Sequence, residues 1–360
     1  MVTDVTVVSA FHNREDQVDL SVSSLLDQTF PHFRAVIVDD GSTDATFDRL
    51  FRFAGGRIEV RRQANQGFTR TIAELCREAD TEFIALHGAG DESLPRRMEA
   101  QRAFLIEHPS VVAVGCGIRN VDEVNGRSWD VMPDAPIKRG PILSGFRISH
   151  GEVMFRRDAY LRAGGYREMF RVGQATDLFR RLSRLGDFGY VPEVLYRRRL
   201  LPSGVNAQLD KLAQREILAA MSSVVHRRAV GEGGTASGTL RADIDAMGAL
   251  FPYLSAPSAE IAVALARAAK LYWMNGDREV ALRLARRSLN EKFTRTGALT
   301  YSAILTGAGA LAPLMTRLVL GRDRDTSEIS LKRLKEAADS RPSEGALSVQ
   351  TRPRTLRPQS

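Results

Sequence analysis

Residues 35–44 read Ala-Val-Ile-Val-Asp-Asp-Gly-Ser-Thr-Asp, an apolar run that ends abruptly in acidic and turn-forming residues. A short apolar run bounded by turn residues is typical of a buried strand. Ser42 and Thr43 can cap a helix, which we expect over about residues 45–53. Residues 5–9, Val-Thr-Val-Val-Ser, are also short and β-branched, and a polar turn follows them. The two stretches therefore predict two buried strands.

The same alternation continues along the chain. Further strands are expected at 58–60, 83–86 and 111–114, and helices at 16–28, 69–78 and 95–107. Strand and helix in alternation predict the α/β class, with a mostly parallel twisted sheet and helices on both faces. After a Pro- and Gly-rich region, residues 131–147, which we expect to be partly β, the pattern predicts a strand at 150–155 and helices at 157–163 and 176–185.

Polar residues follow three of the expected strands, at 11–15, 39–44 and 87–92. Ligands of open α/β sheets bind outside the carboxyl ends of the strands. Any one of these segments could be an ordinary solvated turn. Three together, with paired carboxylates, predict a binding site at this edge of the sheet.

The chain becomes helical after about residue 205. Residues 206–230 and 256–289 are rich in Ala, Leu, Arg and Glu, and 271–285 resembles one unit of a helix-turn-helix repeat. We expect an α/β domain at 1–205, a helical region at 206–335 and a disordered basic tail at 336–360. Residues 296–316 are uncharged and would form a helix of about 31 Å. A buried helical hairpin, a contact with the membrane surface and a membrane span remain open for them.

Composition excludes several classes. The 360 residues include 51 Lys and Arg, 43 Asp and Glu, and two cysteines outside any Cys-x-x-Cys pair, with a net charge of +8. A disordered chain, a collagen and a disulfide-stapled miniprotein are excluded, and the cysteine usage predicts a reducing compartment without structural zinc. The basic clusters lack interleaved aromatics, so no nucleic-acid partner is expected. No secretory signal is expected at the N-terminus.

Several motifs occur in a fixed order. They are residues 5–15, 24–30, 36–44, Asn65 to Gly67, Met154 to Arg157, Gly164 to Tyr166, and Asp177 and Leu178 with Arg181. In this order they resemble family 2 glycosyltransferases, which have the GT-A fold, over about residues 3–205. The resemblance implies inverting transfer of a sugar from a nucleotide-diphosphate sugar to a saccharide or lipid-linked acceptor. It implies a role in cell-surface polysaccharide or glycan synthesis at the cytoplasmic face of the membrane. Peripheral membrane contact is one of the interpretations of residues 296–316.

The resemblance also implies which residues bind the donor. Phe11, Asn13 and Glu15 would flank the base and the ribose. Asp39 and Asp40 would accept hydrogen bonds from the base, and Asn65 and Gly67 would line the same pocket.

The family's Asp-x-Asp signature, which holds Mg²⁺ or Mn²⁺ against the donor diphosphate, falls here on Gly88 and Gly90. Only the following carboxylate, Asp91, remains, with His87 and Glu92 nearby. Two interpretations stay open. Either Asp91 binds a metal with help from these neighbours, or arginines such as Arg199 neutralise the diphosphate.

An inverting transferase needs a carboxylate base. Asp177 is the one carboxylate left in the stretch that resembles the family's base motif, and the resemblance assigns His150 and Glu152 to the acceptor side. Two alternatives remain: a catalytically weakened sugar-nucleotide binder, and a nucleotidyltransferase, for which residues 11–14 lack the Gly and Lys of a phosphate loop.

Overall fold

The computed structural model describes residues 3–123, 125–133, 135–140, 148–200, 209–231 and 257–307. For residues 228–231 it describes the backbone alone. The expected tail at 336–360, part of the 131–147 region and residues 308–316 lie outside the described residues.

The first half of the sheet is parallel. Its four strands pair in the order β3-β2-β1-β4, with Val7 opposite Ala35 and Val5 opposite Phe83. The strands are β1 (Val5–Phe11), β2 (Phe33–Asp40), β3 (Ile58–Gln63) and β4 (Phe83–Leu86). The polar segments after β1, β2 and β4 therefore meet at one edge, as the sequence predicts.

The second half of the sheet is mixed. β9 lies antiparallel between β4 and β6, β10 runs parallel to β6, and β5 pairs antiparallel with β10. The short strands β7 and β8 pair with β6 and β10. The bounds are β5 (Glu92–Ser93), β6 (Val111–Asp122), β7 (Arg127–Val131), β8 (Ile137–Lys138), β9 (Met154–Arg156) and β10 (Asp187–Arg199). The mostly parallel arrangement expected from the sequence thus holds for the first half, whereas β9 enters from the carboxyl edge of β4 and runs the other way.

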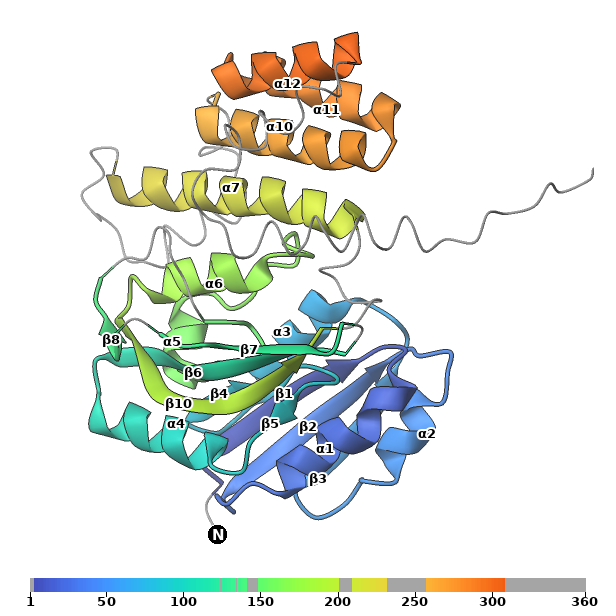
Figure 1. Cartoon of the computed structure of the whole chain (residues 1–360). Helices are drawn as coiled ribbons and strands as arrows, with labels where there is room; N and C mark the ends of the chain where they lie inside the picture. The colour runs from blue at the N-terminus through green and yellow to red at the C-terminus, as the bar shows by residue number, and fades with distance from the viewer. Residues whose placement is uncertain are drawn as a thin grey trace, which may run out of the picture.

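Helices cover both faces of the sheet (Figure 1). One core cluster joins the strands to α1 (Val18–Leu26), α2 (Thr46–Phe51) and α4 (Arg97–Glu107). The other joins them to α3 (Phe68–Glu78), α5 (Arg157–Arg162) and α6 (Gln174–Leu182). Alternate β1 residues enter opposite clusters, Val7 with the first and Val8 with the second, because side chains of a strand point alternately to its two faces.

The helical region packs beyond α6 (Figure 1). It consists of α7 (Leu209–Gly231), α10 (Ala259–Met274), α11 (Arg278–Glu291) and α12 (Arg295–Thr306). The predicted helix-turn-helix at 271–285 is α10 and α11, which break at Asn275 and Gly276. Thr294 caps α12 by accepting from the Gly297 N–H (3.0 Å), and Gly307, at φ +68°, ends it.

Helix α12 contains the first part of the uncharged segment at 296–316. The described part of that segment is a 12-residue helix, about 18 Å long, which is shorter than a bilayer core. Among the helices in the described ranges, none combines the length and apolar character that a membrane crossing needs.

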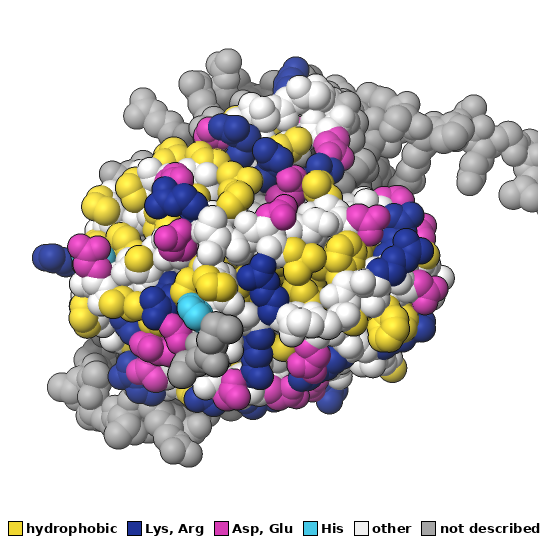
Figure 2. Space-filling view, turned by 90° about the horizontal axis from the view of Figure 1, so that it is seen from below, with side chains coloured by type: hydrophobic (Ala, Val, Ile, Leu, Met, Phe, Trp, Pro, Cys, Tyr) yellow, Lys and Arg dark blue, Asp and Glu magenta, His cyan; other side chains and the backbone are white. Residues whose placement is uncertain are grey.

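Charge is mixed on the outer surface. Lys and Arg side chains lie among Asp and Glu side chains over the face drawn in Figure 2, so neither sign forms a broad patch there. Cys76 and Cys116 are both buried and unpaired.

Candidate active site

The loops after β1 and β2 are tied together by hydrogen bonds. The Asn13 N–H donates to Ser42 Oγ (2.9 Å), and Asn13 Oδ1 accepts from the Thr43 N–H (2.9 Å). Glu15 Oε2 accepts from the Ala45 N–H (2.9 Å). Asn13 and Glu15 therefore brace the neighbouring loop, and their contact with base or ribose stays a prediction.

Phe11 ends β1 with its ring fully buried in the core cluster on the α1 face. Contact with a nucleotide base would require this ring to turn toward the strand ends. Its expected role in the donor pocket therefore stays a prediction as well.

Asp39 ends up buried at the carboxyl end of β2 with one oxygen unpartnered. Its Oδ2 accepts a long hydrogen bond from the Ser42 N–H (3.4 Å) and lies 3.5 Å from Arg62 Nε. Its Oδ1 has no hydrogen-bond partner among the described residues, although the side chain is 0% exposed. A buried acceptor without a donor costs about 1–3 kcal/mol. Such an atom at a strand end is suited to accept a hydrogen bond from a ligand.

Asp40 is buried too, but its oxygens are used by the chain itself. Oδ1 accepts from Gln63 Nε2 (2.8 Å) and from the Gln66 N–H (3.0 Å), and Oδ2 accepts from the Gly67 N–H (2.9 Å). Asp40 thus fixes the 65–67 loop rather than facing an open pocket. Gly41, at φ +69°, permits this approach, because a Cβ there would lie 2.5 Å from the Asn65 nitrogen.

Asp91 lies where the family's metal-binding signature would end. Its Oδ2 accepts from the Tyr196 hydroxyl (2.7 Å), and its Oδ1 accepts from the Arg199 backbone N–H (3.0 Å). Burial raises the pKa of Asp91 to about 6, against the lowering effect of these hydrogen bonds. Both oxygens are therefore engaged by β10.

Glu92 is engaged in the same way. Its Oε2 lies 2.8 Å from Arg197 Nη1, and its Oε1 lies 3.3 Å from Arg199 Nε. Arg199 also forms an ion pair with Glu123. Asp91, Glu92 and Arg199 therefore lie together, and their role toward a metal or a diphosphate stays a prediction.

His87 faces inward. Its two ring nitrogens each lie 2.9 Å from a serine hydroxyl, Ser21 Oγ and Ser93 Oγ. Burial lowers the pKa of His87 to about 3, so the ring is neutral and occupied by the two serines. In the described part of the chain, no group of three or more His, Cys, Asp or Glu residues could hold a metal ion. The oxygens of Asp91 and Glu92 that a divalent metal would need already have partners in β10.

The start of β9 brings the two expected acceptor residues to the end of β4, where the Leu86 N–H donates to the Val153 carbonyl (2.9 Å). His150 Nε2 lies 2.6 Å from the Tyr166 hydroxyl. Glu152 is 0% exposed. Its Oε1 accepts from the Ser149 N–H (2.6 Å), and its Oε2 has no partner among the described residues. Acceptor contact by either residue stays a prediction.

Glu152 makes stability depend on pH. Burial raises its pKa from 4.5 to about 7 in the folded chain, so the unfolded chain ionises first as the pH rises. Stability from this group is therefore present at low pH and lost between about pH 5 and pH 8. Glutamine does not ionise, so Glu152→Gln does not lose this stability. The free energy of unfolding of the variant minus that of the native chain should therefore increase by about 3 kcal/mol from pH 5 to pH 8.

Urea unfolding at several pH values measures this difference, with Glu107→Gln, an exposed position on α4, as the control. A difference for Glu152→Gln that does not change with pH would contradict the assignment.

Asp177, the expected base, lies in the first turn of α6 with its side chain 4% exposed. Its Oδ2 lies 2.6 Å from Arg181 Nη2, and its Oδ1 lies 3.3 Å from Arg167 Nη1. Arg181, also buried, donates to the carbonyls of Ala163 (2.5 Å) and Gly165 (2.6 Å). Asp177 therefore holds the buried Arg181, and its role as base stays a prediction.

Thr69, near the start of α3, connects this region to the strand ends. Its hydroxyl donates to the Phe170 carbonyl (3.0 Å) in the segment before α6. Phe68 packs edge-on against His150, with ring centroids 5.4 Å apart.

Sequence reasoning missed three residues of the site. Tyr196 holds Asp91 from β10, a strand that the sequence pattern did not predict. Arg97 is fully buried and donates to the Leu86 carbonyl (2.6 Å) and to Ser93 Oγ (2.7 Å) beneath the β4 loop. Burial lowers the pKa of Arg14, whereas the charges of Asp91 and Asp44 raise it, so both carboxylates lie near Arg14. In the sequence, only its position directly after Asn13 indicated that Arg14 could belong to the site.

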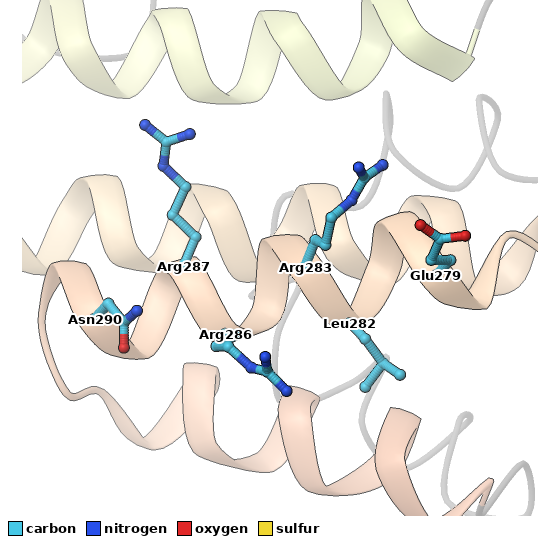
Figure 3. A pocket seen from close by; sticks show the side chains of 6 residues that line it. All are labelled: Glu279, Leu282, Arg283, Arg286, Arg287 and Asn290. Carbon is cyan, nitrogen blue, oxygen red and sulfur yellow. The ribbon is translucent and has the colours of Figure 1, made fainter.

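A separate pocket of about 290 Å³ lies on α11 in the helical region. Arg283 and Arg287 extend from α11 toward α7, and Arg286 extends toward α12 (Figure 3). The three exposed arginines form no ion pair within the described ranges. We call them the α11 arginine face.

Solved structures share this fold. S. aureus TarS 1–349 in complex with UDP-GlcNAc is similar with a TM-score of 0.53 and 14% identity, covering 84% of this chain and 92% of that chain. The mannosyltransferase PcManGT from Pyrobaculum calidifontis, in complex with GDP-Man and Mn²⁺, has a TM-score of 0.51 and 18% identity, covering 94% and 87%. The fold is that of a GT-A-type glycosyltransferase followed by helices.

Sequence comparisons give the family. The model for glycosyl transferase family 2 matches residues 6–164. The putative glycosyltransferase EpsE of Bacillus subtilis (strain 168) is 31% identical over 202 residues, 54% of this chain and 72% of that protein. The putative teichuronic acid biosynthesis glycosyltransferase TuaG of the same organism is 31% identical over 106 residues, 29% of this chain and 42% of that protein. The chain belongs to glycosyl transferase family 2, as its motifs predict, and it is a transferase with relatives in polysaccharide biosynthesis.

Proposed function

We propose that this glycosyltransferase transfers a sugar, with inversion, from a nucleotide-diphosphate sugar to a saccharide or lipid-linked acceptor in cell-surface polysaccharide or glycan synthesis. The observation that carries the proposal is the buried, unpartnered Oδ1 of Asp39 at the carboxyl end of β2. An N–H of a nucleotide base would satisfy this oxygen. The UDP-GlcNAc and GDP-Man in the two similar structures support a nucleotide sugar as donor.

The chemistry is a single displacement. An acceptor hydroxyl oxygen attacks the anomeric carbon while the bond from that carbon to the diphosphate oxygen breaks, and the nucleoside diphosphate leaves with the electron pair. The hydroxyl proton passes to a carboxylate base. Asp177 is the proposed base, supported by its place in the family-like stretch at 174–178.

Thermal unfolding with a panel of nucleotide sugars, followed by a transfer assay with the stabilising donor, tests the proposal. A bound donor raises the unfolding temperature by mass action, and transfer should yield a product of inverted anomeric configuration. Stabilisation without transfer or donor hydrolysis would favour a catalytically weakened sugar-nucleotide binder. No stabilisation by any sugar nucleotide would contradict the proposal.

Peripheral contact with the cytoplasmic face of the membrane is part of the same proposal. The α11 arginine face supports it, together with Phe293, which is 75% exposed next to Lys292. Basic side chains beside an exposed aromatic ring suit an anionic lipid surface. The protein should co-sediment with phosphatidylglycerol vesicles but not with phosphatidylcholine vesicles. Equal recovery of the protein with both kinds of vesicle would contradict the proposed membrane contact.

A further inference from the structure

The loop after β4 is built around its glycines. A Cβ on Gly88 would overlap Asp91 Oδ2 and lie 3.0 Å from the Tyr196 hydroxyl oxygen. Gly90 has φ +96°, a conformation that residues with a side chain rarely adopt. Gly88 therefore cannot carry an aspartate without moving the Asp91–Tyr196 pair, and an aspartate at Gly90 would strain the backbone. The loss of the two carboxylates is therefore part of how this loop packs.

The carboxylates that remain have their oxygens occupied. The two oxygens of Asp91 accept from Tyr196 and from the Arg199 N–H. Those of Glu92 face Arg197 and Arg199. A divalent cation would have to displace these partners to gain oxygen ligands, and Mg²⁺ and Mn²⁺ depend on oxygen ligands.

Arginines surround the same place. Arg197 and Arg199 keep 36% and 24% of their side chains exposed while paired with Glu92. Arg198 Nε donates to the neutral Asn120 Oδ1 (2.8 Å), and Arg198 forms no ion pair within the described ranges. Among the three β10 arginines, Arg198 is therefore the one without a carboxylate partner in the described part of the chain.

We propose that the guanidinium groups of β10, chiefly that of Arg198, offset the charge of the donor diphosphate in this enzyme, so that donor binding does not depend on a divalent metal. The planar guanidinium donates two parallel hydrogen bonds to phosphate oxygens. The inference rests on the proposed function, because it requires a nucleoside diphosphate at the strand ends.

Calorimetric titration of the full chain with UDP and with GDP, in EDTA and in Mn²⁺ or Mg²⁺, tests the inference. The dissociation constant of the nucleotide that binds should differ by less than about threefold between these buffers. Binding that appears only with metal, or tightens about tenfold or more, would overturn the inference and leave the proposed function intact. No binding of either nucleotide in any buffer would refute both.

Two variants test whether the Arg198 guanidinium is the group that binds the diphosphate. Arg198→Met keeps most of the side-chain volume and removes the charge, and it should weaken nucleotide binding in EDTA about tenfold or more. Arg162→Met, which removes an exposed arginine paired with Asp158 on α5, is the matched control and should bind like the native chain. Unchanged binding by Arg198→Met, in a variant whose unfolding temperature matches that of the control, would overturn the role of Arg198.

Discussion

Replacing Asp177 by Asn is expected to lower both stability and turnover, for two separable reasons. Arg181, 2% exposed, would keep its charge and lose its closest carboxylate. Leaving one partner of a buried ion pair uncompensated costs about 3–5 kcal/mol. If Asp177 also removes the acceptor proton, kcat should fall by a further factor of about 10²–10⁴.

A matched control separates the two effects. Arg181→Gln breaks the same ion pair from the other side and leaves the carboxylate in place. It also leaves the carbonyls of Ala163 and Gly165 short of a donor, so its loss of stability should be at least as large. Both variants are compared by urea unfolding and by kcat and KM at a temperature where each remains folded.

The base assignment predicts that Asp177→Asn loses far more kcat than Arg181→Gln. Equal loss of kcat in the two variants would mean that Asp177 only positions α6. Turnover close to that of the native chain in a folded Asp177→Asn would also contradict the assignment.

The predictable part of the fold depends on strands and helices with a clear local pattern. β1 and β2 are buried along nearly their whole length, and parallel strands covered on both faces appear as continuous apolar runs. β10 lacks such a pattern, because Pro192 and Glu193 interrupt it and its register against β6 shifts between Val191 and Val194 and again before Tyr196. An irregular strand with an arginine-rich end resembles a loop in sequence.

The contacts of the site also divide into those that a local sequence pattern predicts and those that it does not. The grouping of Asp39 and Asp40 with the loop after β1 follows from the parallel order of the strands, so it could be predicted. The partner of Asp91 is 105 residues away in the chain, and no local pattern indicates a contact of that range. The pairing of Asp177 with Arg181 could have been predicted from the sequence, because residues four positions apart on a helix lie next to each other.

The second large effect concerns two adjacent aspartates with opposite expected effects on stability. Asp39→Asn removes a buried charge and loses only a long contact with the exposed Arg62 (3.5 Å), so the ligand-free chain should become more stable by about 1 kcal/mol. Asp40→Asn presents an amide N–H₂ group to backbone N–H donors, because both oxygens of Asp40 accept from the 63–67 segment. Its free energy of unfolding should fall by about 2–3 kcal/mol.

Both substitutions should weaken nucleotide binding, by different routes. Asp39→Asn loses a charge-assisted hydrogen bond to the base, which corresponds to roughly 10- to 100-fold weaker binding of the donor nucleotide. Asp40→Asn loosens the 65–67 loop that lines the pocket, so its effect should shrink as temperature is lowered and the loop becomes ordered.

Urea unfolding without ligand and calorimetric titration with the donor nucleotide measure the two quantities on the same samples. The decisive result is Asp39→Asn, which should be more stable than the native chain and yet bind nucleotide poorly. A binding residue often lowers the stability of the free protein, because its polar group is left unsatisfied until the ligand arrives. If Asp39→Asn were less stable than the native chain and bound nucleotide equally well, the Asp39 oxygen would be structural, and the observation that carries the donor site would be lost.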